Sequence, residues 1–94
     1  PRYPALHRHI DVVVDDELKY DLLPAIVRRA GEGLVERIEL LDVYRGEHVG
    51  EGKRSVTLAL EFRSGQRTLT DTEVNSVLAK VKKALQEEAR AGFR

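Results

Sequence analysis

The chain has 94 residues, with 16 basic and 16 acidic side chains that cancel, and no cysteine. This length supports one domain, residues 1–94, with a single core. The lack of cysteine excludes a disulfide framework and thiolate chemistry. Zero net charge argues against a free-standing domain that binds RNA tightly, because phosphate contacts dominate that affinity. Zero net charge is compatible with a module that gains its affinity from a larger protein of which it is a part.

Targeting signals are not visible in the sequence. No apolar run approaches the roughly 20 residues that span a bilayer. No secretory signal peptide is present, so a cytoplasmic location without membrane contact is expected. The chain begins at Pro1 rather than Met, which suggests a fragment or a processed chain.

The first two elements are a strand and a helix. Residues 6–14 read as a strand that ends at an acidic turn. A helix follows, with Asp21 as its N-cap and Pro24 in its first turn, where a missing N–H is tolerated. Gly31 or Gly33 is expected to end it in a left-handed conformation. The apolar face of this helix is formed by Leu22, Leu23, Ile26, Val27 and Ala30.

The second strand, residues 34–45, departs from strict alternation. Leu40 and Leu41 are adjacent apolar residues, and a period of two would place them on opposite faces. A β-bulge is therefore predicted here, and it re-aims Asp42 and Tyr44.

The third strand, residues 55–63, alternates most cleanly, after a glycine-rich, mobile loop over 46–52. One face carries Val56, Leu58, Leu60 and Phe62, and the other carries Ser55, Thr57, Ala59, Glu61 and Arg63. The first group is expected to face the helices.

The last helix opens with a capping box, Thr70 to Glu73. Its apolar positions recur at helical spacing: Val74, Val77, Leu78, Val81 and Leu85. Gly92 is expected to stop it, and Phe93 and Arg94 to begin a short strand. The order βαββαβ predicts an α+β, ferredoxin-like split β-α-β fold. Two helices cover one face of a four-stranded antiparallel sheet, and the open face suits single-stranded RNA.

Three potential metal ligands alternate on the first strand. His7, His9 and Asp11 share the open face, and imidazole and carboxylate are zinc ligands. His7 and Asp11 lie about 13 Å apart, however, from the rise per residue of a strand. One ion therefore reaches at most two of the three without a bend. The preferred interpretation is surface or RNA-facing histidines and no metal site.

Three motifs follow in the second half of the chain. They are Asp42-Val43-Tyr44-Arg45-Gly46, then Gly52-Lys53-Arg54-Ser55, then Arg67-Thr68-Leu69-Thr70-Asp71-Thr72-Glu73. This run resembles the pattern D-x-Y-x-G, G-x-K-S, R-T-L-x-D-x-E of the ferredoxin-fold anticodon-binding domain. That domain closes the beta chain of bacterial phenylalanyl-tRNA synthetase, and the resemblance covers essentially the whole chain.

The resemblance implies that Asp42, Tyr44 and Ser55 contact an anticodon base. Tyr44 would stack on the base, worth roughly 1–3 kcal/mol. Asp42 would accept from a guanine Watson–Crick edge, and Ser55 would complete the reading of that edge. Alternatives stay open for each: Tyr44 packs over the turn, Asp42 caps the following loop, and Ser55 only starts a strand.

The basic residues near this trio have two interpretations as well. Arg45, Lys53 and Arg54 either touch phosphates, which fixes register without reading sequence, or form a solvated loop rim. Arg8 matches an arginine of the family pattern, and pairing with a carboxylate at the sheet edge is equally open to it.

The first strand departs from the family. Where the pattern has R-D-L-x or R-D-I-x, this chain has Arg8-His9-Ile10-Asp11. Asp11 takes the place of a small residue that adjoins the bound base, and Glu61 adds another anion on the neighbouring strand. Both lower the local potential for RNA.

The resemblance implies a non-catalytic module of a phenylalanine–tRNA ligase beta chain. Its partners are the tRNA(Phe) anticodon stem-loop, the rest of the beta chain and the alpha chain. The domain itself needs no cofactor; ATP and magnesium belong to the parent enzyme elsewhere. The alternative is a free-standing or engineered ferredoxin-like domain without RNA binding, which serves as an interaction or ligand-binding module or as a scaffold.

Overall fold

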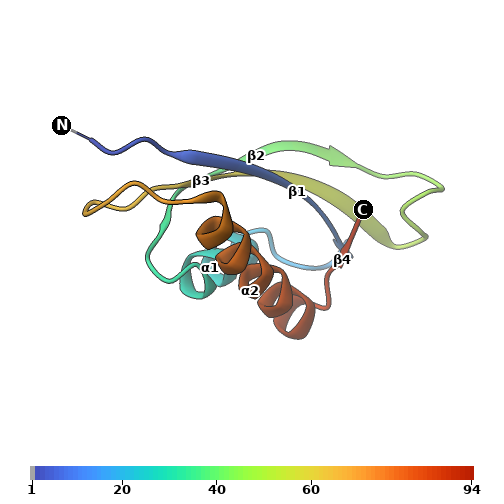
Figure 1. The fold of residues 1–94 in the computed structure, drawn as a ribbon. Coiled ribbons are helices and arrows are strands. Elements are labelled where there is room, and N and C mark those ends of the chain that lie inside the picture. The colour runs from blue at the N-terminus through green and yellow to red at the C-terminus, as the bar shows by residue number, and fades with distance from the viewer. Residues whose placement is uncertain (1) are drawn as a thin grey trace.

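A computed structural model describes residues 2–94 of the chain. The elements in order are β1 (Leu6–Asp15), α1 (Leu22–Ala30), β2 (Val35–Tyr44), β3 (Lys53–Phe62), α2 (Asp71–Ala89) and β4 (Gly92–Phe93). The strands form one antiparallel sheet in the order β2-β3-β1-β4. Both helices lie under the same face of this sheet (Figure 1). The predicted ferredoxin-like α+β fold with one open face is confirmed.

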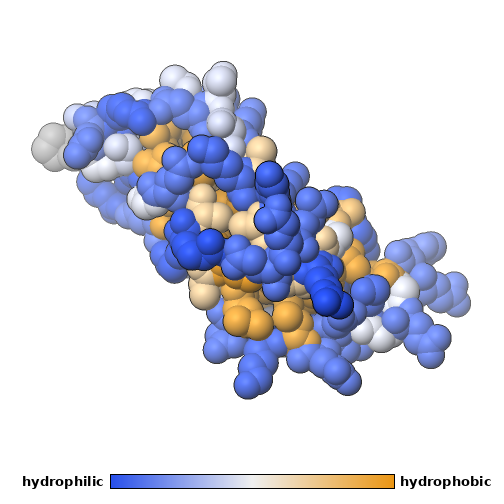
Figure 2. Space-filling model, turned by 90° about the horizontal axis from the view of Figure 1, so that it is seen from below, coloured by the Kyte–Doolittle hydropathy of each residue, from blue (hydrophilic) through white to orange (hydrophobic). Residues whose placement is uncertain are grey.

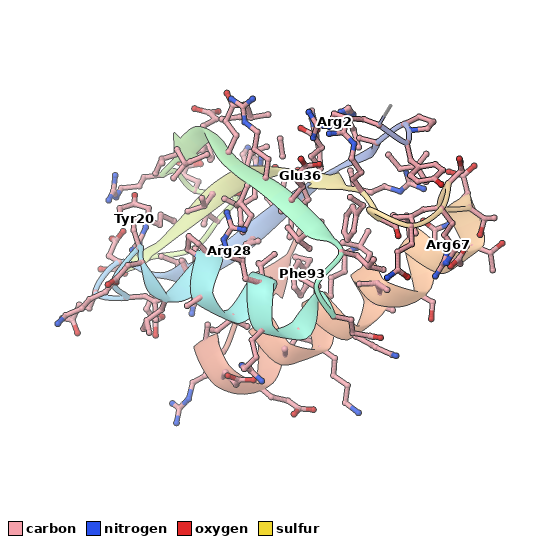
Figure 3. All side chains as sticks on the ribbon, turned by 90° about the vertical axis from the view of Figure 1, so that its left-hand side faces the viewer. Arg2, Tyr20, Arg28, Glu36, Arg67 and Phe93 are labelled. Atoms are coloured by element: carbon pink, nitrogen blue, oxygen red, sulfur yellow. The ribbon has the colours of Figure 1, made fainter. Side chains whose placement is uncertain are left out.

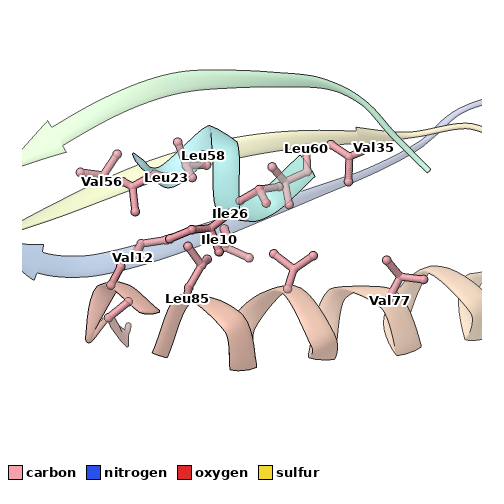
Figure 4. Packing of buried hydrophobic residues seen from close by; sticks show 14 of the residues in the cluster. Ile10, Val12, Leu23, Ile26, Val35, Val56, Leu58, Leu60, Val77 and Leu85 are labelled. Carbon is pink, nitrogen blue, oxygen red and sulfur yellow. The ribbon is translucent and has the colours of Figure 1, made fainter. Parts of the chain in front are cut away.

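The core fills the space between the sheet and the two helices. In β3 the predicted alternation is confirmed: Val56, Leu58, Leu60 and Phe62 are all buried. Their neighbours on β1, such as Ile10 and Val12, face the same helices (Figure 4). Because the other parity of both strands faces away from the helices, those side chains form the open face.

The short helix α1 differs in detail from the prediction. Leu23, Ile26 and Val27 are buried, but Leu22 is 44% exposed, so its assignment to the apolar face was wrong. Asp21 occupies the N-cap position, yet its side chain makes no capping hydrogen bond within the described part of the chain. The left-handed residues after the helix are Glu32 and Gly33 rather than Gly31.

Helix α2 begins as predicted and ends earlier. The Thr70 hydroxyl accepts from the Glu73 backbone N–H, and the Glu73 carboxylate accepts from the Thr70 N–H. The helix ends at Arg90, which has a left-handed φ of 53°. The expectation that Gly92 stops the helix was wrong, because Gly92 already pairs with Val13 in the sheet.

The predicted bulge in β2 is present. Leu40 pairs with Leu58 and Asp42 pairs with Thr57, so Leu41 is the extra residue. Since Leu58 and Thr57 face opposite sides of β3, this insertion turns Asp42 to the open face. A second irregularity near Glu36 was not foreseen, because no adjacent apolar pair marks it in the sequence.

The domain is elongated, with extents of 46 × 22 × 22 Å. The β2–β3 hairpin and its loop extend beyond the helices at one end (Figure 1). Because β2 ends at Tyr44, next to this hairpin loop, no helix covers that end of the sheet. Seen from the helix side, the surface is mostly hydrophilic, with apolar side chains visible between polar ones (Figure 2).

Candidate nucleic-acid interface

One cross-strand row on the open face contains two of the three expected base-contacting residues. Tyr44 of β2 pairs with Ser55 of β3, Ser55 pairs with Val13 of β1, and Val13 pairs with Gly92 of β4. Directly opposed residues in antiparallel strands have their Cβ atoms about 5 Å apart. The structure therefore brings Tyr44 and Ser55 together, as the resemblance implied.

The adjacent row contains the third residue. Asp42 pairs with Thr57, and Thr57 pairs with Asp11. The Thr57 hydroxyl donates to Asp11 Oδ1 at 2.5 Å, so Asp11 is held within the sheet surface. Asp42 Oδ1 accepts from the Val43 N–H at 2.9 Å, and Asp42 itself is exposed. Its carboxylate accordingly points to solvent beside the Tyr44 row.

Tyr44 is 39% exposed and lies against the turn that follows it. A Cβ atom added to Gly46 would fall 2.3 Å from the Tyr44 phenol oxygen. The guanidinium carbon of Arg94 lies 5.3 Å from the centroid of the same ring, within the range of cation–π attraction. The ring therefore rests on the turn and against Arg94 rather than under a helix, and both interpretations of Tyr44 have support in its position.

Ser55 is the least exposed of the three expected base-contacting residues. It lies on the face without helices, yet only 1% of its surface is exposed. Its Oγ is buried and has no hydrogen-bond partner among residues 2–94. Buried hydroxyls in folded proteins are usually paired, so this oxygen has an unused capacity to donate and accept.

Arg45 and Lys53 reach the rim of this surface, where carboxylates pair with them. Arg45 Nε lies 2.9 Å from Asp16 Oδ1, and Lys53 Nζ lies 2.9 Å from Asp15 Oδ1. The hydrogen bond from Lys53 lowers the pKa of Asp15 below its ordinary value. Exposed ion pairs of this kind contribute about 0–1 kcal/mol, so a phosphate can replace either carboxylate at little cost.

Arg54 does not lie on the open face, so both interpretations of it, as a phosphate contact and as part of a solvated loop rim, were wrong. It pairs with Val14, on the helix side of the sheet, and is 1% exposed. Its guanidinium donates to the carbonyl oxygens of Asp15 and Leu18, each at 2.7 Å, and stacks on Tyr20 at 4.2 Å. Figure 3 shows Tyr20 at the end of the molecule where these segments meet. Arg54 thus fastens the β1–α1 connection.

Arg8 also faces the helices, and the carboxylate-pairing interpretation holds. Arg8 Nη2 lies 2.8 Å from Asp71 Oδ1, and Nε donates to Asn75 at 3.2 Å. Both partners belong to α2, whose N-terminus favours nearby acids. Arg8 therefore ties β1 to this helix and does not join the open-face group.

The two histidines lie farther along the open face. His7 and His9 are exposed and line a shallow depression of about 150 Å³, together with Arg37, Glu39, Ala59, Leu60 and Glu61. In residues 2–94, no three histidine or acidic side chains are close enough to hold a metal ion. The structure therefore does not bring His7, His9 and Asp11 together as ligands.

Arg94 was not expected at this site. Its backbone N–H donates to the Asp11 carbonyl oxygen at 3.1 Å, which extends the β1–β4 pairing by one residue. Its position on the open face depends on the register of β4 against β1. A two-residue strand has no periodicity from which that register could be read.

A model of the family described as "Ferredoxin-fold anticodon binding domain" matches residues 1–94. Among curated relatives, the phenylalanine–tRNA ligase beta subunit of Symbiobacterium thermophilum is 45% identical over 86 residues, which are 92% of this chain and 10% of that protein. The beta subunits of Clostridium tetani and Bacillus subtilis are 38% and 37% identical over 94 residues. That match covers all of this chain and 12% of each subunit.

The chain thus spans about a tenth of the length of the curated relatives that it matches. No helix in residues 2–94 is long and apolar enough to cross a membrane. The family model matches residues 1–94, and the open sheet face with the Tyr44–Ser55 pair is consistent with that match. The chain belongs to the ferredoxin-fold anticodon-binding domain family.

Proposed function

We propose that this domain binds the anticodon stem-loop of a phenylalanine tRNA and reads one anticodon base on its open sheet face. The observation that carries the proposal is the pairing of Tyr44 with Ser55 on a face that no helix covers. An aromatic ring next to a buried hydroxyl that has no partner among residues 2–94 offers both a stacking surface and a reader of base edges.

Each side chain has a separate role in this proposal. Tyr44 stacks on the base, which is worth roughly 1–3 kcal/mol. Asp42, whose Oδ1 already accepts from Val43, uses its remaining acceptor capacity for N–H groups of a guanine edge. A base that shows acceptors there is disfavoured, because the carboxylate has no proton to donate. Ser55 completes the edge, as its hydroxyl both donates and accepts.

The rim residues position the RNA without reading it. Arg45 and Lys53 exchange their exposed carboxylate partners for phosphates. Asp11 lies in the row next to Tyr44 and opposes a close phosphate, which keeps the affinity of the isolated domain low. The rest of the affinity comes from the larger enzyme through linkage on one chain.

The wider assignment follows from the relatives, whose name is phenylalanine–tRNA ligase beta subunit. In this proposal the domain is a non-catalytic part of such a beta chain in the cytoplasm. The alpha chain, ATP and magnesium act elsewhere in the ligase, and this domain orients the tRNA.

The experiment is a titration of the 94-residue chain with a phenylalanine anticodon stem-loop at low salt. We expect weak, salt-sensitive binding that falls about tenfold or more in Tyr44→Ala. Replacement of the anticodon guanine by adenine should weaken binding to the wild type, and Asp42→Asn should reduce that preference. Arg29→Ala is the control, because it changes the net charge on α1, away from the sheet surface.

A second function is favoured by the acidic side chains on the open face, namely a ferredoxin-like interaction or scaffold domain that does not bind RNA. Asp11, Glu39, Asp42 and Glu61 all lie on this face or its edge. If the stem-loop does not bind even at low salt, or if Tyr44→Ala binds as well as the wild type, the RNA proposal is wrong and this alternative stands.

A further inference from the structure

Arg94 and Tyr44 reach one another from opposite edges of the sheet. They belong to the segments that flank the order β2-β3-β1-β4, and three strand spacings separate those edges by about 14 Å. The 5.3 Å distance between the Arg94 guanidinium and the Tyr44 ring therefore requires that the Arg94 side chain extends over the sheet surface toward β2. Between Tyr44 and β4, the same cross-strand row contains Ser55 of β3 and Val13 of β1.

The burial of Ser55 is consistent with this arrangement. A residue on a face without helices needs side chains to cover it, and Ser55 is nevertheless 1% exposed. Tyr44 and Val13 flank Ser55 in its row, and Arg94 contacts the Tyr44 ring. Ser55 Oγ is buried and has no hydrogen-bond partner in the part of the chain described. A buried hydroxyl that no described residue satisfies points to a ligand that does.

We propose that Arg94 is a further RNA-binding residue, which covers Ser55 in the unbound domain and stacks on the anticodon base when it enters. This inference rests on the proposed function. In this proposal the Arg94 side chain leaves the Tyr44 ring when a base enters and approaches Ser55 Oγ. In its new position the base lies between the planar guanidinium and the phenol ring. Arginine guanidinium planes stack on unpaired bases much as aromatic rings do.

The exchange is energetically modest. The exposed Arg94–Tyr44 contact is of the weak cation–π class. It is replaced by two stacking contacts and by the hydrogen bond that Ser55 lacks. The Arg94 backbone stays fixed, because its N–H donates to Asp11, so only the side chain rotates. Arg94 continues the β4 register opposite Asp11, so its positive charge also offsets that carboxylate.

The test compares Arg94→Ala and Arg94→Lys with the wild type in the stem-loop titration. We expect Arg94→Ala to bind about tenfold more weakly, from the loss of one stacking contact. Arg94→Lys should also bind several-fold more weakly, because lysine keeps the charge but lacks the planar group. Arg29→Ala, which removes the same charge elsewhere, should bind within twofold of the wild type.

The movement has its own readout. In the unbound chain the Arg94 Nε–H and Cδ protons should show a ring-current shift from Tyr44, which Tyr44→Leu removes. These signals should move on RNA addition in the wild type. Wild-type binding with no loss in Arg94→Ala, or with unmoved Arg94 signals, overturns the role of Arg94 alone. No wild-type binding overturns the proposed function and this inference together.

Discussion

Replacement of Arg54 should destabilise the domain without directly affecting RNA contact. The side chain is 1% exposed and donates two 2.7 Å hydrogen bonds to the carbonyl oxygens of Asp15 and Leu18. Hydrogen bonds to charged groups contribute about 1.5–3 kcal/mol each. The stack on Tyr20 adds roughly 1 kcal/mol.

The net loss of stability is smaller than this sum, because burial of the guanidinium costs desolvation free energy, and the alanine variant does not incur that cost. We expect Arg54→Ala to lower the free energy of unfolding by about 3 kcal/mol, a large part of the 5–10 kcal/mol typical of such a domain. The midpoint of thermal unfolding should fall by roughly 12–24 °C.

Urea unfolding followed by far-UV circular dichroism measures this loss. Arg54→Met separates packing from hydrogen bonding, since it keeps much of the side-chain volume but leaves both carbonyl oxygens unpaired. Arg45→Ala is the exposed control and should change stability by less than about 1 kcal/mol. If Arg54→Ala is as stable as Arg45→Ala, or if folded Arg54→Met loses RNA affinity at low temperature, the structural assignment of Arg54 is wrong.

Three other predictions concern single positions. Gly46→Ala should reduce RNA binding with little loss of stability, because its Cβ would displace the flexible Tyr44 ring; a titration beside a urea melt separates the two effects, and unchanged binding contradicts it. Gly31→Ala should destabilise the domain by about 1–3 kcal/mol, since its Cβ would fall 2.4 Å from Val35 Cγ2. If the urea midpoint of this variant equals that of the wild type, the expected steric clash with Val35 does not occur. The hydrogen bond from the N-cap backbone N–H lowers the pKa of Glu73 below its ordinary value of 4.5. The unfolded chain therefore binds more protons, so this contribution is complete above pH 4.5 and is lost as the pH falls through the depressed pKa. The stability difference between the wild type and Glu73→Gln should shrink over that range, and a constant difference from pH 7 to pH 3 would show that the carboxylate contributes nothing.

Local rules were sufficient for much of the fold. Alternation in β3 gave its buried face, and the adjacent pair Leu40 and Leu41 gave the bulge, because both patterns come from the two-residue period of a strand. The capping box at Thr70 was equally readable, since it depends on side chains only three residues apart. These features led to the open face and to Tyr44 at its end.

Other features depend on contacts between distant segments. Leu22 has the spacing of a core residue, but the short helix α1 leaves it exposed to solvent. Arg54 looks like a loop-rim cation in the sequence, yet strand register turns it under the sheet toward the carbonyl oxygens of the β1–α1 connection. No local pattern predicts the position of Arg54, because the carbonyl groups that it contacts lie more than 30 residues away.

The sequence by itself determined the element order, the faces of the strands and the positions of Asp42, Tyr44 and Ser55, since these follow from the period of the backbone. Only the tertiary structure decided which charged residues share that face. Arg8 and Arg54 pair with groups on the helix side, whereas Arg94, from the opposite edge of the sheet, contacts the Tyr44 ring. The physical reason is that a long basic side chain goes where an acceptor or a ring lies within reach, and strand pairing between distant segments sets those positions.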